Sequence, residues 1–377
     1  MKIVLAGGGT GGHFYPLIAV AEKINKLVEE RKLLKPQIYY LSNAPYDKKM
    51  LFENDIIFKK VSAGKLRRYF SVLNLFGLFK TGWGFIKSFF LVFSIFPDVV
   101  FSNGGNASFP VLLSAKIFRI PVLIHISDTV PGRTNAWAAK FAKKVSLGFS
   151  EAEEFLSIKK DKIAVLGNPV RKELMKPLSE GAREFLDLSE GIPVILILGG
   201  SSGSQAINES IVDALPELVQ KYQIIHQTGK QGITEVENRA RVVLENSEYK
   251  ERYKVFAYLN TLALRMSAGI ADLVISRAGA GSISEIALWG LPSIVIPIPE
   301  EVSSDQRKNA FSFARAGATV VIEQGNLTTH ILLSEIKHLM ENETKRKELG
   351  ENAKKFAKAD AAEKIARGIL NLALEHE

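Results

Sequence analysis

The chain of 377 residues contains no cysteine, which excludes disulfide bonds, thiolate nucleophiles and cysteine-based metal sites. It also lacks a long apolar run near its start, where residues 3–6 are too few for a signal peptide and lead directly into glycines. Hydrophobic residues make up 46% and charged residues 24%, which is typical of a globular protein with enough core for two domains. The net charge of +9 favours anionic partners, namely nucleotides, nucleic acid or an anionic membrane, without choosing among them.

Acidic residues are absent from residues 56–97, where every charged side chain is basic: Lys59, Lys60, Lys65, Arg67, Arg68, Lys80 and Lys87. Apolar residues recur there at helical spacing in two stripes, the first of Phe76, Phe79, Trp83, Ile86, Phe90 and Phe93 and the second of Phe85, Phe89, Val92 and Phe96. One stripe is enough for a core, so two stripes with basic neighbours predict a helix lying in the interface of an anionic membrane. The lysines make the run too short to span a bilayer. The alternative is a core helix with a partner-binding face, and Gly77, Gly82 and Gly84 weaken the prediction of one long helix.

Strand and helix patterns alternate along the chain, which is typical of a doubly wound parallel sheet in an α/β protein. Strands are predicted at residues 2–6, 37–42, 56–58, 98–102, 121–126, 145–149 and 163–167 and, after a restart, at 193–198, 223–227, 254–257, 273–276, 293–298 and 319–322. Each half opens with a strand, a glycine loop and a helix, so we expect two Rossmann-like domains facing across a cleft. The expected domains are residues 1–165 and 166–354, with a linker near 168–171 and a C-terminal helix at about 355–377 that can pack back on the first domain.

The first glycine loop fits the dinucleotide spacing at Gly7, Gly9 and Gly12, but the second predicted strand ends in Ser42 rather than in the acidic residue that holds a ribose of NAD. The loop therefore indicates only that a backbone approaches something closely. His13 lies at its end, where the positive end of the helix dipole favours a neutral imidazole. A neutral histidine in a cleft is a candidate general base, and the alternative is a histidine that only caps or packs.

The later stretch 275–309 begins with a buried strand, a turn of small residues from Ala278 to Ser282, and a helix that stops at Gly290. A strand, a glycine turn and a helix N-terminus together form an anion site, because free N–H groups and the helix dipole point the same way. Glu285 lies about one turn into this helix, and a carboxylate beside a phosphate site is suited to the hydroxyls of a ribose. The alternative, a helix-capping glutamate, is equally compatible with the local pattern.

An ordered set of motifs resembles the MurG family of bacterial transferases, which belong to glycosyltransferase family 28 and have the GT-B fold. The resemblance extends in order from Ile3 to about Gly317. The motifs that carry it are Gly8-Gly9-Thr10-Gly11-Gly12-His13 with Pro16, Gly104-Gly105 with Ser108 and Pro110, Pro131-Gly132 with Thr134-Asn135, Gly167-Asn168-Pro169-Val170-Arg171, Gly199-Gly200-Ser201 with Asn208, and Ser276-Arg277-Ala278-Gly279-Ala280 with Glu285, Gly290, Pro292, Gln306, Asn309 and Ala310.

The resemblance implies inverting transfer of N-acetylglucosamine from UDP-GlcNAc to the C4 hydroxyl of undecaprenyl-diphospho-N-acetylmuramoyl-pentapeptide, at the cytoplasmic face of the bacterial plasma membrane. It implies His13 as the base, Glu285 on the uridine ribose and Gln306 on the GlcNAc. It also implies UDP contacts from Arg171, Ser201, Ala280, Gly281, Ser282, Ile283 and Ser284, with Thr10, Gly11 and Gly12 near the donor and the acceptor diphosphate. No cofactor and no metal are expected, and other cell-wall synthesis proteins are conceivable partners.

Two departures from the family pattern lie where the donor sugar is expected. The family commonly has His-Glu-Gln-Asn where this chain has His125-Ile126-Ser127-Asp128, and often paired glutamines where it has Asp305-Gln306. An aspartate accepts a hydrogen bond from a sugar hydroxyl but, unlike asparagine, does not donate one. Asp128 is therefore a sugar contact or a second candidate base.

The chain contains no Asp-x-Asp motif of the kind that holds a divalent metal in many nucleotide-sugar enzymes. We therefore expect helix N-terminal N–H groups and Arg171 to stabilise the leaving UDP. Three alternatives stay open: a related family 28 glycolipid glycosyltransferase, a UDP-sugar epimerase of similar fold, and a nucleic-acid-binding protein. The last is disfavoured because the basic residues interleave with a helical phenylalanine stripe rather than with a stacking sheet.

Overall fold

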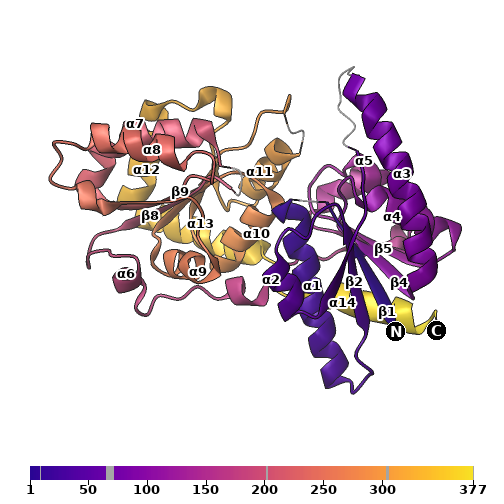
Figure 1. The fold of residues 1–377 in the computed structure, drawn as a ribbon. Helices are drawn as coiled ribbons and strands as arrows, with labels where there is room; N and C mark the ends of the chain where they lie inside the picture. Colours follow the sequence, from indigo (N-terminus) through magenta and orange to yellow (C-terminus); the bar gives the residue numbers. More distant parts are fainter. Residues whose placement is uncertain (9, 65–71, 201–202, 303–304, 377) are drawn as a thin grey trace. The chain divides into compact units, whose positions relative to one another are not determined.

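The computed structural model describes residues 1–8, 10–64, 72–200, 203–302 and 305–376, and the side chains of these residues except 72–80. The chain forms two units (Figure 1). The first comprises Met1–Arg171 and Lys358–Glu377, and the second comprises Lys172–Ala357. The main chain thus passes from the first unit to the second after Arg171 and returns at Lys358.

The first unit is built on a sheet of seven parallel strands in the order β3-β2-β1-β4-β5-β6-β7. Its strands are β1 (Lys2–Ala6), β2 (Gln37–Ser42), β3 (Ile56–Lys60), β4 (Val99–Ser102), β5 (Val122–Ile126), β6 (Lys144–Leu147) and β7 (Ile163–Val165). The order reverses between β1 and β4, which is the Rossmann arrangement, and ligands of such sheets bind at the carboxyl ends of these two strands. The predicted Rossmann-like fold is confirmed.

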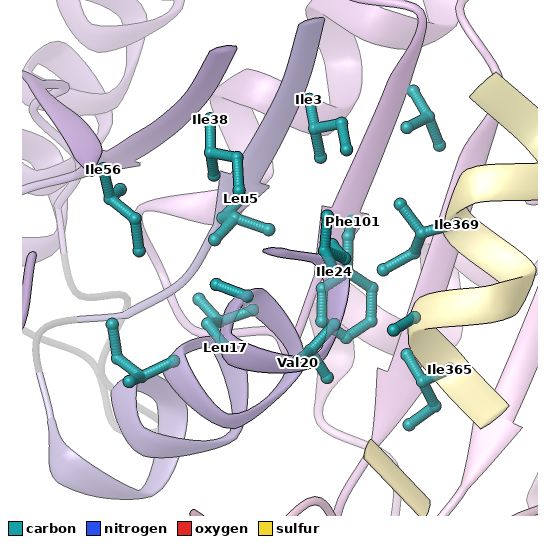
Figure 2. Close-up of a cluster of buried hydrophobic side chains, with 14 of the residues drawn as sticks. Ile3, Leu5, Leu17, Val20, Ile24, Ile38, Ile56, Phe101, Ile365 and Ile369 are labelled. Carbon is teal, nitrogen blue, oxygen red and sulfur yellow. The ribbon is translucent and has the colours of Figure 1, made fainter. Parts of the chain in front are cut away.

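Helices cover both faces of this sheet: α1 (Gly11–Glu30), α2 (Lys48–Glu53), α3 (Val72–Ile95), α4 (Ser108–Ile117), α5 (Arg133–Ala139) and α14 (Ala361–Leu374). Ile3 and Leu5 of β1 face a core shared with α1 and with Ile365 and Ile369 of α14 (Figure 2). Val4, between them, faces a second core formed with α3, α4 and α5. This alternation places apolar residues on both faces of the strand, which is why the strand reads as a continuous hydrophobic run.

The second unit repeats this plan with a sheet of six parallel strands in the order β10-β9-β8-β11-β12-β13. Its strands are β8 (Val194–Leu198), β9 (Gln223–Gln227), β10 (Tyr253–Phe256), β11 (Leu273–Ser276), β12 (Ser293–Val295) and β13 (Val320–Val321). Its α-helices are α6 (Ala182–Phe185), α7 (Gln205–Lys221), α8 (Ile233–Val243), α9 (Thr261–Ile270), α10 (Ala280–Trp289), α11 (Gln306–Arg315), α12 (Thr329–Glu341) and α13 (Glu343–Phe356). The strand order reverses between β8 and β11, which places the second predicted glycine turn at the equivalent point of this sheet.

Helix α3 is one continuous helix, although its glycines weaken the sequence-based prediction of a long helix. Gly84 explains part of this result, because a Cβ built there would lie only 1.5 Å from the carbonyl oxygen of Ser62. A glycine is therefore required where the helix packs against the preceding segment, and that segment is also tied by a 3.0 Å hydrogen bond from Gly64 N to Thr81 Oγ1. Tertiary packing outweighs the roughly 1 kcal/mol helix penalty of a glycine.

The two apolar stripes of α3 differ in exposure. In the first stripe, Trp83 is 67%, Phe90 63% and Phe93 60% exposed. In the second, Val92 is buried, and Phe89 packs on Phe118 with the ring centroids 4.7 Å apart. Phe85 and Phe89 are half-buried. Among the described side chains, Trp83, Phe90 and Phe93 are therefore on the outward face of the helix, and Phe96 at its end is 51% exposed.

Candidate active site

Two glycine loops meet at the carboxyl ends of β1 and β4, where the strand order of the first sheet reverses. A Cβ on Gly105 would lie 2.5 Å from the Cα of Gly8, so the two loops touch backbone to backbone. Gly105 has a positive φ of 90°, which also favours glycine. A Cβ on Gly8 would lie 2.9 Å from Cδ2 of His13. The glycines thus make a notch that the half-buried imidazole of His13 fills.

The hydrogen bonding of His13 defines which ring nitrogen can act as a base. Its Nδ1 lies 2.9 Å from the carbonyl oxygen of Asn103, at the end of β4. Because a carbonyl only accepts hydrogen bonds, Nδ1 must carry the proton in the neutral ring, and Nε2 then carries the lone pair. His13 is the third residue of α1, where the helix dipole also favours the neutral form.

The other predicted residues of the first loop lie at the start of α1. Thr10 is the exposed N-cap residue, and its carbonyl accepts from the amides of His13 and Phe14 at 3.1 and 3.0 Å. Gly11 is buried, and a Cβ there would lie 2.7 Å from the hydroxyl of Tyr46. Gly12 is exposed, and a Cβ there would meet no described atom within 4 Å. The backbone at Gly12 is therefore accessible to a ligand.

Arg171, predicted to contact the UDP, is the last residue of the first unit before the chain passes to the second. Its guanidinium lies 4.2 Å from the ring centroid of Tyr15 on α1 and is almost fully buried. Its Nη1 lies 4.0 Å from Sδ of Met50 on α2. Arg171 thus adds a positive charge beside the first turns of α1, on the same unit as His13.

On the strand next to β4, His125 at the end of β5 is completely buried in a polar network. Its Nδ1 lies 3.0 Å from Ser146 Oγ and its Nε2 lies 2.9 Å from Oδ1 of Asn168. Burial lowers its pKa to about 4, although both hydrogen bonds act in the opposite direction. His125 therefore stays neutral at pH 7 and holds the first residues of the predicted linker. Asp128, three residues further on, is half-buried.

In the second unit, the turn after β11 leads into α10, whose N-cap is Gly279 and whose first residue is Ala280. Gly281 is exposed, Ala280 and Ile283 are buried, and Ser284 Oγ donates to the carbonyl of Ala280 at 2.7 Å. The N–H groups at the start of α10 have no partner within the helix, so the anion site here stays a prediction with a suitable backbone geometry.

Glu285 is the sixth residue of α10, so it is not the third-position glutamate of a capping box. Glu285 lies on the same helix face as the exposed Gly281, which comes four residues earlier in the chain. Side chains of a helix lean toward its N-terminus, so the half-buried carboxylate of Glu285 leans toward the first turn. The position does not fit a capping box, and a role of Glu285 beside a bound nucleotide stays a prediction.

The loop that follows β12 carries the predicted sugar contact Gln306, the first residue of α11. Gln306 Oε1 accepts from the amide of Ile298 at 3.3 Å. Arg277, after β11, donates to the carbonyls of Ile296 and Pro297 at 3.1 and 3.3 Å and to Gln324 at 2.6 Å. Burial lowers the pKa of Arg277 to about 10, so it remains charged at pH 7 and stabilises this loop.

Some predicted residues lie outside the described part of the chain: Ser201, Arg67 and Arg68, together with the side chains of Phe76 and Phe79. Within the described part, no three His, Asp or Glu side chains are grouped so as to hold a metal ion. Among the same residues, no helix combines the length and the hydropathy that a membrane-crossing segment needs. Residues that the sequence interpretation missed are Asn103, Asn168 as a partner of His125, and Arg277 as an anchor of the Gln306 loop.

The buried histidines predict a loss of stability in acid. Burial lowers the pKa of His125 to about 4 and that of His226, in β9, to about 3, against about 6.5 in an unfolded chain. The folded state binds fewer protons, so stability is fully present above pH 6.5 and falls as the pH drops toward 4. Each histidine should contribute up to about 1.4 kcal/mol per pH unit in this window. Urea unfolding between pH 7 and pH 4.5 measures the slope.

The matched variants are His125→Gln for the first unit and His226→Gln for the second. Each should be less stable than the wild type at pH 7, because hydrogen bonds are lost, and should lose less stability on acidification. His330→Gln, on an exposed side chain, is the control. Equal slopes for the wild type and both buried-site variants would contradict the assignment.

Comparisons with known proteins match both units. The model of the glycosyltransferase family 28 N-terminal domain matches residues 3–147, and that of the family 28 C-terminal domain matches residues 194–365. A UDP-N-acetylglucosamine–N-acetylmuramyl-(pentapeptide) pyrophosphoryl-undecaprenol N-acetylglucosamine transferase of Halothermothrix orenii is 35% identical over 95% of both chains. A transferase of the same name from Bacillus thuringiensis is 36% identical over 90% of this chain and 92% of its own.

Solved structures share the fold at lower identity. The crystal structure of MurG from Acinetobacter baumannii is 23% identical, with a TM-score of 0.70 over 98% of this chain and 99% of that one. A UDP-GlcNAc 2-epimerase from Neisseria meningitidis, bound to UDP-GlcNAc, is 16% identical, with a TM-score of 0.69 over 98% and 100%. The fold alone therefore does not separate transferase from epimerase, whereas the domain models and the full-length relatives do: the chain belongs to glycosyltransferase family 28.

Proposed function

We propose that this protein transfers N-acetylglucosamine from UDP-GlcNAc to the C4 hydroxyl of undecaprenyl-diphospho-N-acetylmuramoyl-pentapeptide, with inversion at the anomeric carbon. The observation that carries the proposal is the 35% identity to a transferase of this name over 95% of both chains. The geometry of His13 supports it, because an acceptor hydroxyl needs a base with an available lone pair.

In this reaction, Nε2 of His13 takes the proton of the acceptor hydroxyl while the hydroxyl oxygen attacks the anomeric carbon. The bond from that carbon to the UDP oxygen breaks, and the leaving diphosphate takes its electron pair. The N-terminus of α10 stabilises the diphosphate charge with backbone N–H groups that need no reorganisation. Glu285 accepts hydrogen bonds from the ribose hydroxyls, and the amide group of Gln306 contacts the sugar.

Incubation with radiolabelled UDP-GlcNAc, with and without a polyprenyl-diphospho-MurNAc-pentapeptide acceptor, tests the proposal. Label should enter the lipid fraction only when the acceptor is present. Conversion of UDP-GlcNAc to another UDP-sugar without an acceptor would instead make the protein an epimerase. Transfer to a different glycolipid acceptor only would leave the family assignment intact and change the substrate.

Donor binding gives a second measurable prediction. Glu285→Ala should raise the KM for UDP-GlcNAc by roughly 10- to 150-fold, because a hydrogen bond to a charged group is worth about 1.5–3 kcal/mol. The dissociation constant of UDP, measured by calorimetry, should rise in parallel. Glu217→Ala, which removes an exposed carboxylate on α7, is the matched control. An unchanged UDP affinity in Glu285→Ala would remove Glu285 from the site.

We also propose that the enzyme works as a peripheral protein on the cytoplasmic face of the plasma membrane, where the lipid tail of the acceptor remains. The exposed side chains of Trp83, Phe90 and Phe93 on α3 support this proposal, together with the exposed Lys87 between them. Exposed aromatic residues beside basic ones are the combination that interfacial helices use on anionic lipid.

A further inference from the structure

Asn103 connects three segments of the candidate site in the first unit. Its side-chain Nδ2 donates to the carbonyls of Gly12 and His13 at 3.1 and 3.3 Å, and its Oδ1 accepts from Ser127 Oγ at 2.8 Å. Its main-chain carbonyl oxygen lies 2.9 Å from Nδ1 of His13. We propose that Asn103, held by Ser127, is the positioning residue that sets the tautomer and orientation of His13, an inference that rests on the proposed transfer reaction.

The amide orientation of Asn103 follows from its partners. The carbonyls of Gly12 and His13 can only accept, so the NH2 group must face them, and Oδ1 must face the hydroxyl of Ser127. The side chain is 1% exposed, so no water competes for these bonds. Every polar atom of the asparagine side chain is thus used to join the end of β4 to the first turn of α1 and to the end of β5.

These side-chain hydrogen bonds help to fix the direction of the Asn103 carbonyl. The two residues that follow, Gly104 and Gly105, have positive φ values of 82° and 90°, so the chain turns sharply away after Asn103. The peptide is held at its N-terminal side by the hydrogen bond from Asn103 N to the carbonyl of Ala6 at 3.2 Å. With its side chain locked as well, the carbonyl points to Nδ1 of His13.

The tautomer matters because the neutral imidazole in water favours the proton on Nε2, the nitrogen that must be unprotonated to act as a base here. A fixed carbonyl at Nδ1 reverses this preference before substrate binds. In other proteins, too, a carboxylate or carbonyl that accepts from one ring nitrogen of a histidine fixes its tautomer. The pair formed by Asn103 and Ser127 therefore acts through His13 and not by touching the substrate.

Nuclear magnetic resonance can test the tautomer without any substrate. In protein labelled with 15N-histidine, long-range 1H–15N correlation distinguishes the two neutral forms and the cation for each ring, and the His13→Gln variant assigns the His13 signals. Above pH 8, wild-type His13 should show the proton on Nδ1. In Asn103→Leu, which has nearly the same volume but no polar atoms, the signals should shift toward the Nε2-protonated form. A wild-type ring protonated on Nε2, or an unchanged tautomer in Asn103→Leu, would overturn the inference.

Steady-state kinetics give the second readout. Asn103→Leu should lower kcat at least 10-fold and leave the KM for UDP-GlcNAc within 2-fold, because Glu285 and Gln306, the main proposed donor contacts, belong to the second unit. Ser127→Ala should lower kcat less, and Ser127→Thr, which keeps the hydroxyl, should retain the wild-type rate. Ser114→Ala, which removes a buried hydroxyl bonded to the carbonyl of Pro110 in α4, is the matched control for a general loss of packing.

The two proposals fail in different ways. If the wild type transfers no sugar, the proposed function is wrong, while the His13 tautomer still reports on the hydrogen bond. If the wild type transfers GlcNAc and Asn103→Leu changes only the thermal unfolding temperature, with kcat and the tautomer unchanged, Asn103 has a structural role only and the inference is wrong.

Discussion

Replacing His13 with alanine should lower kcat for GlcNAc transfer by roughly 10²- to 10⁴-fold, the usual contribution of a general base. The reason is specific to one atom: Nδ1 is directed at the Asn103 carbonyl, so Nε2 is the nitrogen that can take the proton of the acceptor hydroxyl. Donor affinity should change little, because Glu285 and Gln306 belong to the other unit. Initial rates with saturating donor and acceptor give kcat, and calorimetry with UDP gives donor affinity.

His330→Ala, which removes an exposed imidazole on α12, controls for the loss of a histidine as such. If kcat holds in His13→Ala and only the acceptor KM rises, His13 is a binding residue and the base lies elsewhere. Asp128 is then the next candidate, because it follows Ser127 directly at the end of β5. Adding Asp128→Asn to His13→Ala separates these cases. If His13 is the base, the double variant should have nearly the same kcat as His13→Ala, and if Asp128 is the base, kcat should fall strongly only when Asp128→Asn is added.

The fold was predictable because parallel strands buried on both faces are continuous apolar runs, and such runs are visible in the sequence. Strand β1, for example, alternates between two cores yet contains no polar residue after Lys2. The helix starts were less visible. Helix α1 already begins at Gly11, inside the first glycine loop, although glycine and Pro16 are poor helix formers in isolation, because tertiary packing decides.

Within the candidate site, short motifs indicated which loops and helix starts to consider, whereas contacts made across the sheet were not visible in the sequence. Asn103 lies 90 positions after His13 in the sequence, and they meet only because β1 and β4 are neighbours. The motif around Gly104 indicated that a loop lies there, but no local pattern gives the direction of one carbonyl. The stacking of Arg171 on Tyr15 is another contact of this kind, since it depends on where the end of the first unit returns to α1.

The membrane proposal predicts the second large effect. Trp83, Phe90 and Phe93 are each at least 60% exposed and follow one another on the outward face of α3. Transfer of such a side chain from water into the membrane interface is worth on the order of 1 kcal/mol or more, given 1.5–3 kcal/mol for complete burial. The triple variant Trp83→Ser, Phe90→Ser and Phe93→Ser should therefore bind anionic vesicles at least about 100-fold more weakly than the wild type.

Charge should contribute separately, because each basic residue near an anionic leaflet adds about 1 kcal/mol and this term is screened by salt. Wild-type binding should fall between low and high salt, and the paired change Arg67→Glu with Arg68→Glu should reduce mainly the salt-dependent part. Phe85 is not included among the aromatic substitutions. It is half-buried, with its ring centroid 6.1 Å from that of Phe89, so its removal would also disturb packing.

Co-sedimentation with vesicles rich in anionic lipid measures both terms, and Leu34→Ser with Phe52→Ser is the matched control. These two side chains are 89% and 84% exposed on the same unit, but they lie outside α3, so their loss tests whether any exposed apolar residue has the same effect. Transfer to a short, water-soluble acceptor analogue should survive in the triple variant, because His13 and its partners are on other elements. If the wild type does not sediment even at low salt, or if the triple variant sediments equally well, this face of α3 is not a membrane-binding surface and the membrane proposal is wrong.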